Sequence, residues 1–203
     1  RYGMAVGVGW WKDTGAFCEY HYSLVTPEGK LLDAVKLHPF RFGGEGEQFQ
    51  GGGHVPVCTY GGFCIGVQIC YDLRFPEPFQ ILSRQADLIL VPASWPAVRS
   101  AHWKCLLKAR AIENVVYIAG INCAGEMGEQ FYSGDSRICA PDGAKLKKET
   151  VCLPDRCPQE QVQIYELEND VCRYRACFPV KEDRRDTLYQ RLQEELQNYE
   201  GKK

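Results

Sequence analysis

The apolar positions of the chain fall into short runs that predict strands, and the first three runs lie close together. Residues 4–11, 20–26 and 30–37 are apolar or alternating over the length of a strand. A Pro-Glu-Gly turn at residues 27–29 separates the second run from the third, which favours an antiparallel hairpin. The following segment, residues 40–53, is rich in Gly and Glu and predicts a loop.

Strand and helix patterns alternate through the middle of the chain. A Gly61-Gly62 pair between two apolar runs is typical of a β-hairpin turn. The second run, which we expect to end at Cys70, leads through a proline-containing segment into a helical pattern that ends at Gln85. The strands predicted for this part are residues 55–60, 63–69, 87–92 and 115–121. This alternation favours an α/β fold.

Two further helical patterns are separated by short predicted strands at residues 136–139 and 161–167. Residues 100–114 carry apolar side chains at helical spacing, and Ser100 is expected to cap the N-terminus of this helix. Residues 186–203 form a polar helical tail with one leucine stripe, which consists of Leu188, Leu192 and Leu196. Such a stripe most often packs on the protein's own core, and contact with a partner subunit is the alternative.

Composition and charge narrow the classes of function. The 203 residues include 24 Lys and Arg and 26 Asp and Glu, which gives a formal net charge of −2. A balance this close to zero removes the electrostatic argument for binding nucleic acid or an acidic membrane surface. No apolar stretch reaches the roughly 18 residues of a membrane-spanning helix, and the N-terminus lacks the pattern of a signal peptide. We therefore expect a soluble cytoplasmic protein.

The eleven cysteines are the most unusual part of the composition. An odd number cannot all pair internally, and a chain of this length does not need disulfides, so we expect free thiols in a reducing compartment. Two pairs, Cys152 with Cys157 and Cys172 with Cys177, superficially suggest a zinc site. The spacing within each pair is wide for a zinc finger, and Cys172 and Cys177 face opposite ways if their segment is a strand. We therefore expect no metal.

One cysteine lies where catalytic residues often gather. Cys70 follows a predicted buried strand and precedes a sharp turn and a helix. Active sites collect at the carboxyl ends of strands in open α/β sheets, and a helix N-terminus favours thiolate over thiol. The alternative is a buried structural cysteine, which is the commoner fate of this residue type.

Four sequence blocks favour the catalytic alternative. They are KLHPF at residues 36–40, VQICYDLRFPE at 67–77, PASWP at 92–96 with HW at 102–103 and ARAIEN at 109–114, and YSGDS at 132–136 with PDG at 141–143. In this order and spacing they resemble the motifs of the nitrilase, or carbon–nitrogen hydrolase, superfamily. The resemblance runs from Met4 to about Tyr189. It implies an α/β fold, a four-layer α-β-β-α sandwich, in a single domain over residues 1–203.

The resemblance also implies a Glu–Lys–Cys triad that cleaves the C–N bond of an amide or nitrile. Cys70 would attack the carbon and form a thioester with loss of ammonia, and water would then release the acid. Lys36 would stabilise the oxyanion together with the backbone N–H of Tyr71. A second glutamate of the family positions the lysine and the substrate, and Glu45 and Glu47 both match its place. Outside such a motif, a lysine in this position is most often a solvated surface charge.

The general base of the family has no match in this chain. It is a glutamate in the first strand–helix unit, several dozen residues ahead of the lysine. Glu19 and Glu28, the two glutamates before Lys36, do not fit that motif. We therefore expect a truncated chain that lacks the first strand–helix unit and exposes a sheet edge and apolar surface. Without the base, turnover is expected to fall by about two to four orders of magnitude.

The blocks CYDLRFPE, ASWP and KLHPF look most like the omega-amidase branch of the superfamily. This similarity implies an amidase for a small carboxylate-bearing amide such as 2-oxoglutaramate, a homodimer or larger homo-oligomer, and no cofactor. Arg74 could bind the substrate carboxylate or form a structural salt bridge. Trp95 could line the pocket or fill the core. The alternatives are a family amidase or carbamoylase with another substrate class, and a non-catalytic binding or scaffold protein on this fold.

Overall fold

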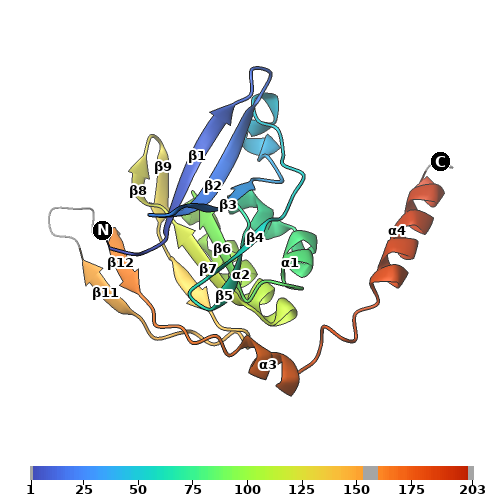
Figure 1. Ribbon diagram of the computed structural model, residues 1–203. Helices are drawn as coiled ribbons and strands as arrows, with labels where there is room; N and C mark the ends of the chain where they lie inside the picture. Colours follow the sequence, from blue (N-terminus) through green and yellow to red (C-terminus); the bar gives the residue numbers. More distant parts are fainter. Residues whose placement is uncertain (1, 153–159, 201–203) are drawn as a thin grey trace.

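The computed structural model describes residues 2–152 and 160–200, which form two main sheets and four α-helices (Figure 1). The three-stranded sheet has the order β1-β2-β3, and the five-stranded sheet has the order β10-β7-β6-β5-β4. The strands are β1 (Val6–Asp13), β2 (Cys18–Thr26), β3 (Gly29–Val35), β4 (Val57–Tyr60), β5 (Phe63–Val67), β6 (Leu88–Ala93), β7 (Tyr117–Asn122), β8 (Ala124–Met127), β9 (Gln130–Ser133), β10 (Arg137–Cys139), β11 (Glu149–Cys152) and β12 (Gln161–Ile164). The helices are α1 (Pro76–Leu82), α2 (Ser100–Asn114), α3 (Val171–Cys177) and α4 (Asp186–Glu200).

The three-stranded sheet confirms the strands predicted near the N-terminus. β1 pairs with β2, and β2 pairs with β3 across the tight turn at residues 27–28, so all three strands are antiparallel. β1 is an edge strand, and all eight of its residues are exposed. Trp11 is 62% exposed and Val6 46%, so this edge strand carries exposed apolar side chains.

The five-stranded sheet places the carboxyl ends of its central strands at one edge. β5, β6 and β7 are parallel neighbours, with Ile65 opposite Leu88 and Leu88 opposite Tyr117. The predicted hairpin joins β4 to β5, and both turn glycines have positive φ, +58° at Gly61 and +79° at Gly62. Two successive left-handed residues form the turn that matches the twist of a two-residue hairpin.

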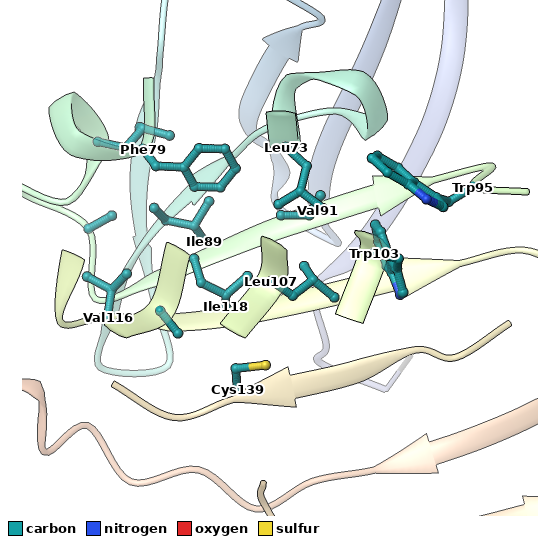
Figure 2. Close-up of a cluster of buried hydrophobic side chains, with 13 residues drawn as sticks. Leu73, Phe79, Ile89, Val91, Trp95, Trp103, Leu107, Val116, Ile118 and Cys139 are labelled. Carbon is teal, nitrogen blue, oxygen red and sulfur yellow. The ribbon is translucent and has the colours of Figure 1, made fainter. Parts of the chain in front are cut away.

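Two buried clusters hold the layers together. The first lies between the two sheets and joins β2 and β3 to β5, β6 and β7; its members include Tyr22, Leu24, Leu32, Ile65, Val67, Leu88 and Tyr117. The second lies between the five-stranded sheet and the helices α1 and α2, where Phe79, Ile89, Trp103, Leu107 and Ile118 interdigitate (Figure 2). The described residues therefore form an α-β-β stack, three layers of the expected α-β-β-α sandwich.

Several element boundaries differ from the sequence expectation. The expected strand 63–69 ends at Val67, and Cys70 begins a 3-10 helix, Cys70–Arg74. The expected loop 40–53 contains two 3-10 helices, Arg41–Gly43 and Glu45–Glu47. α2 has the predicted bounds, but its N-cap is Arg99. Ser100 is the first helical residue instead, and its hydroxyl donates to Asp135 Oδ2 at 2.7 Å.

The C-terminal part departs most from expectation. α3 and the β8–β9 ribbon had no counterpart among the predicted elements. α4 confirms the predicted tail helix, but it projects away from the sheets (Figure 1). Leu192 is 44% and Leu196 66% exposed, so the expectation that the leucine stripe packs on the protein's own core is wrong. None of the helices formed by the described residues has the length and apolar character needed to cross a membrane.

Candidate active site

A single buried carboxylate joins the two segments that carry the sequence motifs. Asp72, 1% exposed, accepts hydrogen bonds from the backbone N–H groups of Leu37 at 3.2 Å, His38 at 2.8 Å and Ile69 at 3.0 Å. The ring Nδ1 of His38 lies 2.8 Å from Asp72 Oδ1. Because β3 precedes Leu37 and β5 precedes Ile69, Asp72 fastens the end of one sheet to the end of the other.

Cys70 occupies a strained turn at this junction. Its φ is +50°, a left-handed conformation that side chains other than glycine rarely adopt. The neighbouring hydrogen bonds hold the turn in place, since Asp72 N donates to Ile69 O at 3.1 Å and Arg110 Nη2 donates to Leu73 O at 3.0 Å. Strain of this kind persists where the surroundings over-determine the conformation, and it is frequent at active sites.

The environment of the Cys70 thiol favours its neutral form. Burial raises the pKa of Cys70 above its ordinary value, while the positive charge of Lys36 and a hydrogen bond with the backbone of Ser94 act in the opposite direction. The carboxylates of Glu45 and Asp72 raise this pKa further. The sequence expectation that this position favours the thiolate is therefore wrong for the resting protein, although the effect of Lys36 has the expected sign. A thiol with a raised pKa must lose its proton to a base before or during attack.

Lys36 is a buried cation, in contrast to the solvated charge usual for lysine. It is 3% exposed, and its Nζ lies 2.6 Å from Glu45 Oε2. The same Glu45 oxygen accepts the backbone N–H of Phe40 at 2.7 Å, and Lys36 Nζ lies 5.0 Å from the centre of the Tyr20 ring. This ion pair holds the ammonium group in a fixed position.

The structure separates the two glutamates that the sequence left as alternatives. Glu45 contacts Lys36, whereas Glu47 is exposed and does not belong to the residues that line the cavity described below. The two glutamates stand at opposite ends of the 3-10 helix Glu45–Glu47, which turns the second side chain away.

Cys70 and Lys36 line one cavity of about 850 Å³. Glu45, Tyr71, Arg74 and Trp95, four further residues singled out from the sequence, line the same cavity. Many of its apolar lining residues are aromatic. They come from the three-stranded sheet, the segment after β3 and the β8–β9 ribbon, and include Trp10, Trp11, Tyr20, Phe40, Phe42 and Tyr132. The cavity is therefore large enough for a small organic molecule, and both aromatic and charged side chains line it.

Tyr71 supplies a backbone N–H near the thiol. The hydrogen bonds of the 3-10 helix Cys70–Arg74 begin at Asp72 N, so the N–H of Tyr71 precedes the first bond of that helix. Such a free donor, together with the Lys36 ammonium, is suited to stabilise negative charge that develops on a carbonyl oxygen.

Trp95 fulfils both roles that the sequence left open. It is 4% exposed and belongs to the core cluster beside Trp103, at a ring distance of 5.5 Å (Figure 2). It also lines the cavity. Its backbone is fixed by Asn122, which accepts from Trp95 N at 2.6 Å and donates to Trp95 O at 3.0 Å. The Arg74 guanidinium carbon lies 4.9 Å from the centre of the Trp95 ring.

Arg74 makes no salt bridge with a carboxylate in the described part of the chain. Besides its contact with Trp95, its Nη2 lies 3.4 Å from His102 Nδ1.

Sequence reasoning missed the roles of Asp72 and Asn122, although Asp72 lies within the nucleophile block, two residues after Cys70. A short polar side chain beside a nucleophile turn was the available signal for its part in fixing that turn.

The described residues do not support a zinc site at the two cysteine pairs. Within residues 2–152 and 160–200, no group of three or more His, Cys, Asp or Glu is arranged to hold a metal ion. Cys172 and Cys177 are exposed near the two ends of α3, which is a helix rather than a strand. Cys157 and the side chain of Cys152 lie outside the described part of the chain.

Comparisons with known proteins agree with the motif blocks. A protein-family model described as carbon-nitrogen hydrolase matches residues 19–152. The omega-amidase YafV of Yersinia enterocolitica is 43% identical over 118 residues, which cover 58% of this chain and 46% of that protein. The 2-oxoglutaramate amidase of Bacillus subtilis is 35% identical over 126 residues, which cover 60% of this chain and 45% of that protein. The chain thus spans about half the length of the curated relatives it matches.

Solved structures give the same result for the fold. XC1258 from Xanthomonas campestris, a CN-hydrolase superfamily protein with an arsenic adduct in its active site, matches with a TM-score of 0.78 and 31% identity. That match covers 91% of this chain and 71% of XC1258. A mutant of the amidase from Nesterenkonia sp. AN1, in which acrylamide has added to the active-site cysteine, matches with a TM-score of 0.78 and 25% identity over 94% of this chain and 70% of that amidase.

Proposed function

The chain belongs to the carbon–nitrogen hydrolase family, and from this premise we propose that it cleaves the amide bond of a small carboxylate-bearing amide through a thioester on Cys70. The observation that carries the proposal is the position of the Cys70 thiol in one cavity with the Lys36–Glu45 ion pair. The names of the omega-amidase and 2-oxoglutaramate amidase relatives support the substrate class, of which 2-oxoglutaramate is the representative.

In the proposed reaction, the sulfur of Cys70 attacks the carbonyl carbon of the amide. The oxygen becomes negatively charged, and Lys36 Nζ and the Tyr71 N–H stabilise it. The C–N bond then breaks, the thiol proton leaves with the nitrogen, and ammonia departs from a thioester. Water attacks the thioester, which releases the carboxylic acid and restores the thiol. Glu45 acts as a positioning residue, because its carboxylate fixes the ammonium of Lys36.

Deprotonation of Cys70 and activation of water are the steps expected to limit the rate of the proposed reaction. Among the described residues that line the cavity, Glu45 is the one carboxylate, and its Oε2 is occupied by Lys36 and Phe40 N. The raised pKa of Cys70 makes a base necessary for attack, and hydrolysis of the thioester needs a base to activate water. We therefore expect slow turnover by this chain, with acylated Cys70 as the species that accumulates.

Covalent labelling tests this proposal. Incubation with 2-oxoglutaramate is expected to add one acyl group to Cys70, seen by intact mass. Incubation with acrylamide is expected to alkylate Cys70 as well as exposed thiols such as Cys105, and peptide mapping distinguishes the adduct on Cys70 from the others. Because the pKa of Cys70 is raised, the rate of acrylamide addition is expected to keep increasing above pH ~8.5, the ordinary pKa of a thiol. Cys70→Ser removes the adduct, and Cys105→Ser, at an exposed cysteine outside the cavity, serves as the matched control.

A second candidate function is a non-catalytic binding protein on the same fold. The observation that favours it is the engagement of Glu45 in the Lys36 ion pair, which leaves the buried thiol without a free carboxylate among the described cavity residues. This alternative predicts that Cys70 resists both amide and acrylamide over the whole pH range. Such a result would contradict the amidase proposal.

Assembly and location complete the proposal. We expect a homodimer or larger homo-oligomer in the cytoplasm, where nine described cysteines, all free, stay reduced. The exposed apolar side chains of β1 and of α4, among them Trp11 and Leu196, provide surface that association can bury. Light scattering on a size-exclusion column is expected to give at least twice the 23.0 kDa mass of the chain. A monomer at micromolar concentration would contradict this expectation.

A further inference from the structure

The cavity holds more positive than negative charge. The lysine, arginine and glutamate residues that line it are Lys36, Arg74, Arg99 and Glu45. The carboxylate of Glu45 neutralises the Lys36 ammonium at 2.6 Å. His21 lies between two carboxylates, with its ring nitrogens 3.3 Å from Glu19 and 3.2 Å from Asp33. The two arginines therefore give the cavity a net positive charge, which favours an anionic ligand.

The two arginines differ in what already contacts them. The Arg74 guanidinium lies 4.9 Å from the centre of the Trp95 ring, and its Nη2 lies 3.4 Å from His102 Nδ1. The Arg99 guanidinium has one aromatic neighbour, the Phe40 ring at 5.9 Å, and has no carboxylate or hydrogen-bond partner among the described side chains and backbone groups. All of its N–H donors are thus available, although the residue is only partly exposed.

The backbone of Arg99 is fixed. Its N–H donates to Pro96 O at 3.0 Å, and its carbonyl accepts from the indole Nε1 of Trp95 at 2.9 Å. Arg99 is also the N-cap residue of α2, a helix of 15 residues with no side-chain cap hydrogen bond. The partial positive charge at the N-terminus of that helix adds to the charge of the guanidinium.

We propose that Arg99 binds the carboxylate of the substrate and selects amides that carry this charge at the end opposite the scissile bond. This inference rests on the proposed amidase function and deepens it. The planar guanidinium presents two parallel N–H donors to a carboxylate, a geometry that a lysine or a neutral side chain does not provide. It assigns the role that the sequence analysis offered to Arg74 to a different arginine, and Arg74 becomes part of the cavity wall against Trp95.

A comparison of two matched substrates tests the assignment. Glutaramate and pentanamide have the same chain length, and only glutaramate carries the distal carboxylate. Arg99→Gln is expected to lower kcat/KM, or the rate of Cys70 acylation, for glutaramate by about 10- to 100-fold, the effect of losing a charge-assisted contact, and to leave pentanamide within about twofold. Arg99→Lys is expected to recover part of the loss. Arg173→Gln, at an arginine whose side chain is 74% exposed on α3, is the matched control.

Binding of glutarate, which needs no chemistry, separates this inference from the proposed function. We expect calorimetry to show glutarate binding to the full chain, about 10-fold or more weaker in Arg99→Gln, and unchanged in Arg173→Gln. Equal weakening of glutaramate and pentanamide, or glutarate binding that does not depend on Arg99, would overturn the assignment. Absence of Cys70 acylation with Arg99-dependent glutarate binding intact would overturn the amidase proposal alone.

Discussion

Replacing Lys36 with glutamine is expected to lower the rate of Cys70 acylation by about 100- to 1,000-fold, because the ammonium stabilises an oxyanion that forms only in the transition state. Glutamine keeps the approximate size of the side chain and removes its charge. Since the interaction is made in the transition state, the loss is expected in kcat, with KM nearly unchanged. Single-turnover kinetics with 2-oxoglutaramate, followed by mass spectrometry, measure the effect.

The Lys36→Gln variant needs a control for folding, because it leaves the Glu45 carboxylate without its partner. The double variant Lys36→Gln with Glu45→Gln removes both charges and is expected to regain most of the thermal stability lost by the single variant. It is not expected to regain acylation. Recovery of the acylation rate together with Tm would contradict the role proposed for Lys36 and assign the defect to folding.

Replacing Asp72 with alanine is expected to lower the free energy of unfolding by about 3–5 kcal/mol. The change removes a buried acceptor and leaves the N–H groups of Leu37, His38 and Ile69 without their partner. Because these groups lie at the ends of β3 and β5, the loss is expected to disturb the positions of Lys36 and Cys70 together. Urea denaturation followed by circular dichroism measures the change in stability.

Asp142→Ala is the matched control for Asp72. Asp142 is exposed and accepts the N–H of Ala144 at 2.8 Å, so its replacement is expected to cost about 1 kcal/mol or less. If Asp72→Ala lowered the free energy of unfolding no more than Asp142→Ala does, the Asp72 carboxylate would not be the group that holds the ends of the two sheets together.

The sequence predicted the strands and the motif residues that meet in the cavity, and local pattern explains why. The strands β5, β6 and β7 are nearly continuous apolar runs, and the glycine pair before β5 specifies its hairpin. The block around Cys70 then follows a buried strand directly, so its place at the sheet edge depends on short-range order. Lys36 and Cys70 could be paired from the sequence only because both blocks resemble one family.

The contacts within the site could not be predicted from the sequence because they join segments that are distant along the chain. The sequence pattern does not distinguish Glu45 from Glu47. The direction in which each side chain leaves the 3-10 helix determines which one contacts Lys36. The net effect on the Cys70 pKa follows from how deeply the thiol is buried, which no local pattern reports. The Asp72 carboxylate binds Ile69, which is 3 residues away in sequence, but also His38 and Leu37, which are 34 and 35 residues away.

The helix predictions show the same limit. The periodicity of apolar residues predicted the helices α2 and α4, but it did not predict which parts of the protein they contact. Ser100 is a favourable capping residue in isolation, yet its hydroxyl binds Asp135, which comes from a segment 35 residues away. The leucine stripe of α4 has the spacing of a packed helix, while the segment before it carries the helix away from the body of the protein (Figure 1).

The left-handed backbone at position 70 restricts how the chemistry of this cavity can evolve. A φ of +50° is poorly compatible with side chains that branch at Cβ, so a threonine there would strain the turn. Serine has the same unbranched shape as cysteine and fits the backbone, although its hydroxyl is a far weaker nucleophile without a base. Among thiol and hydroxyl nucleophiles, cysteine and serine therefore fit this position better than threonine, whatever substrate the surrounding walls come to accept.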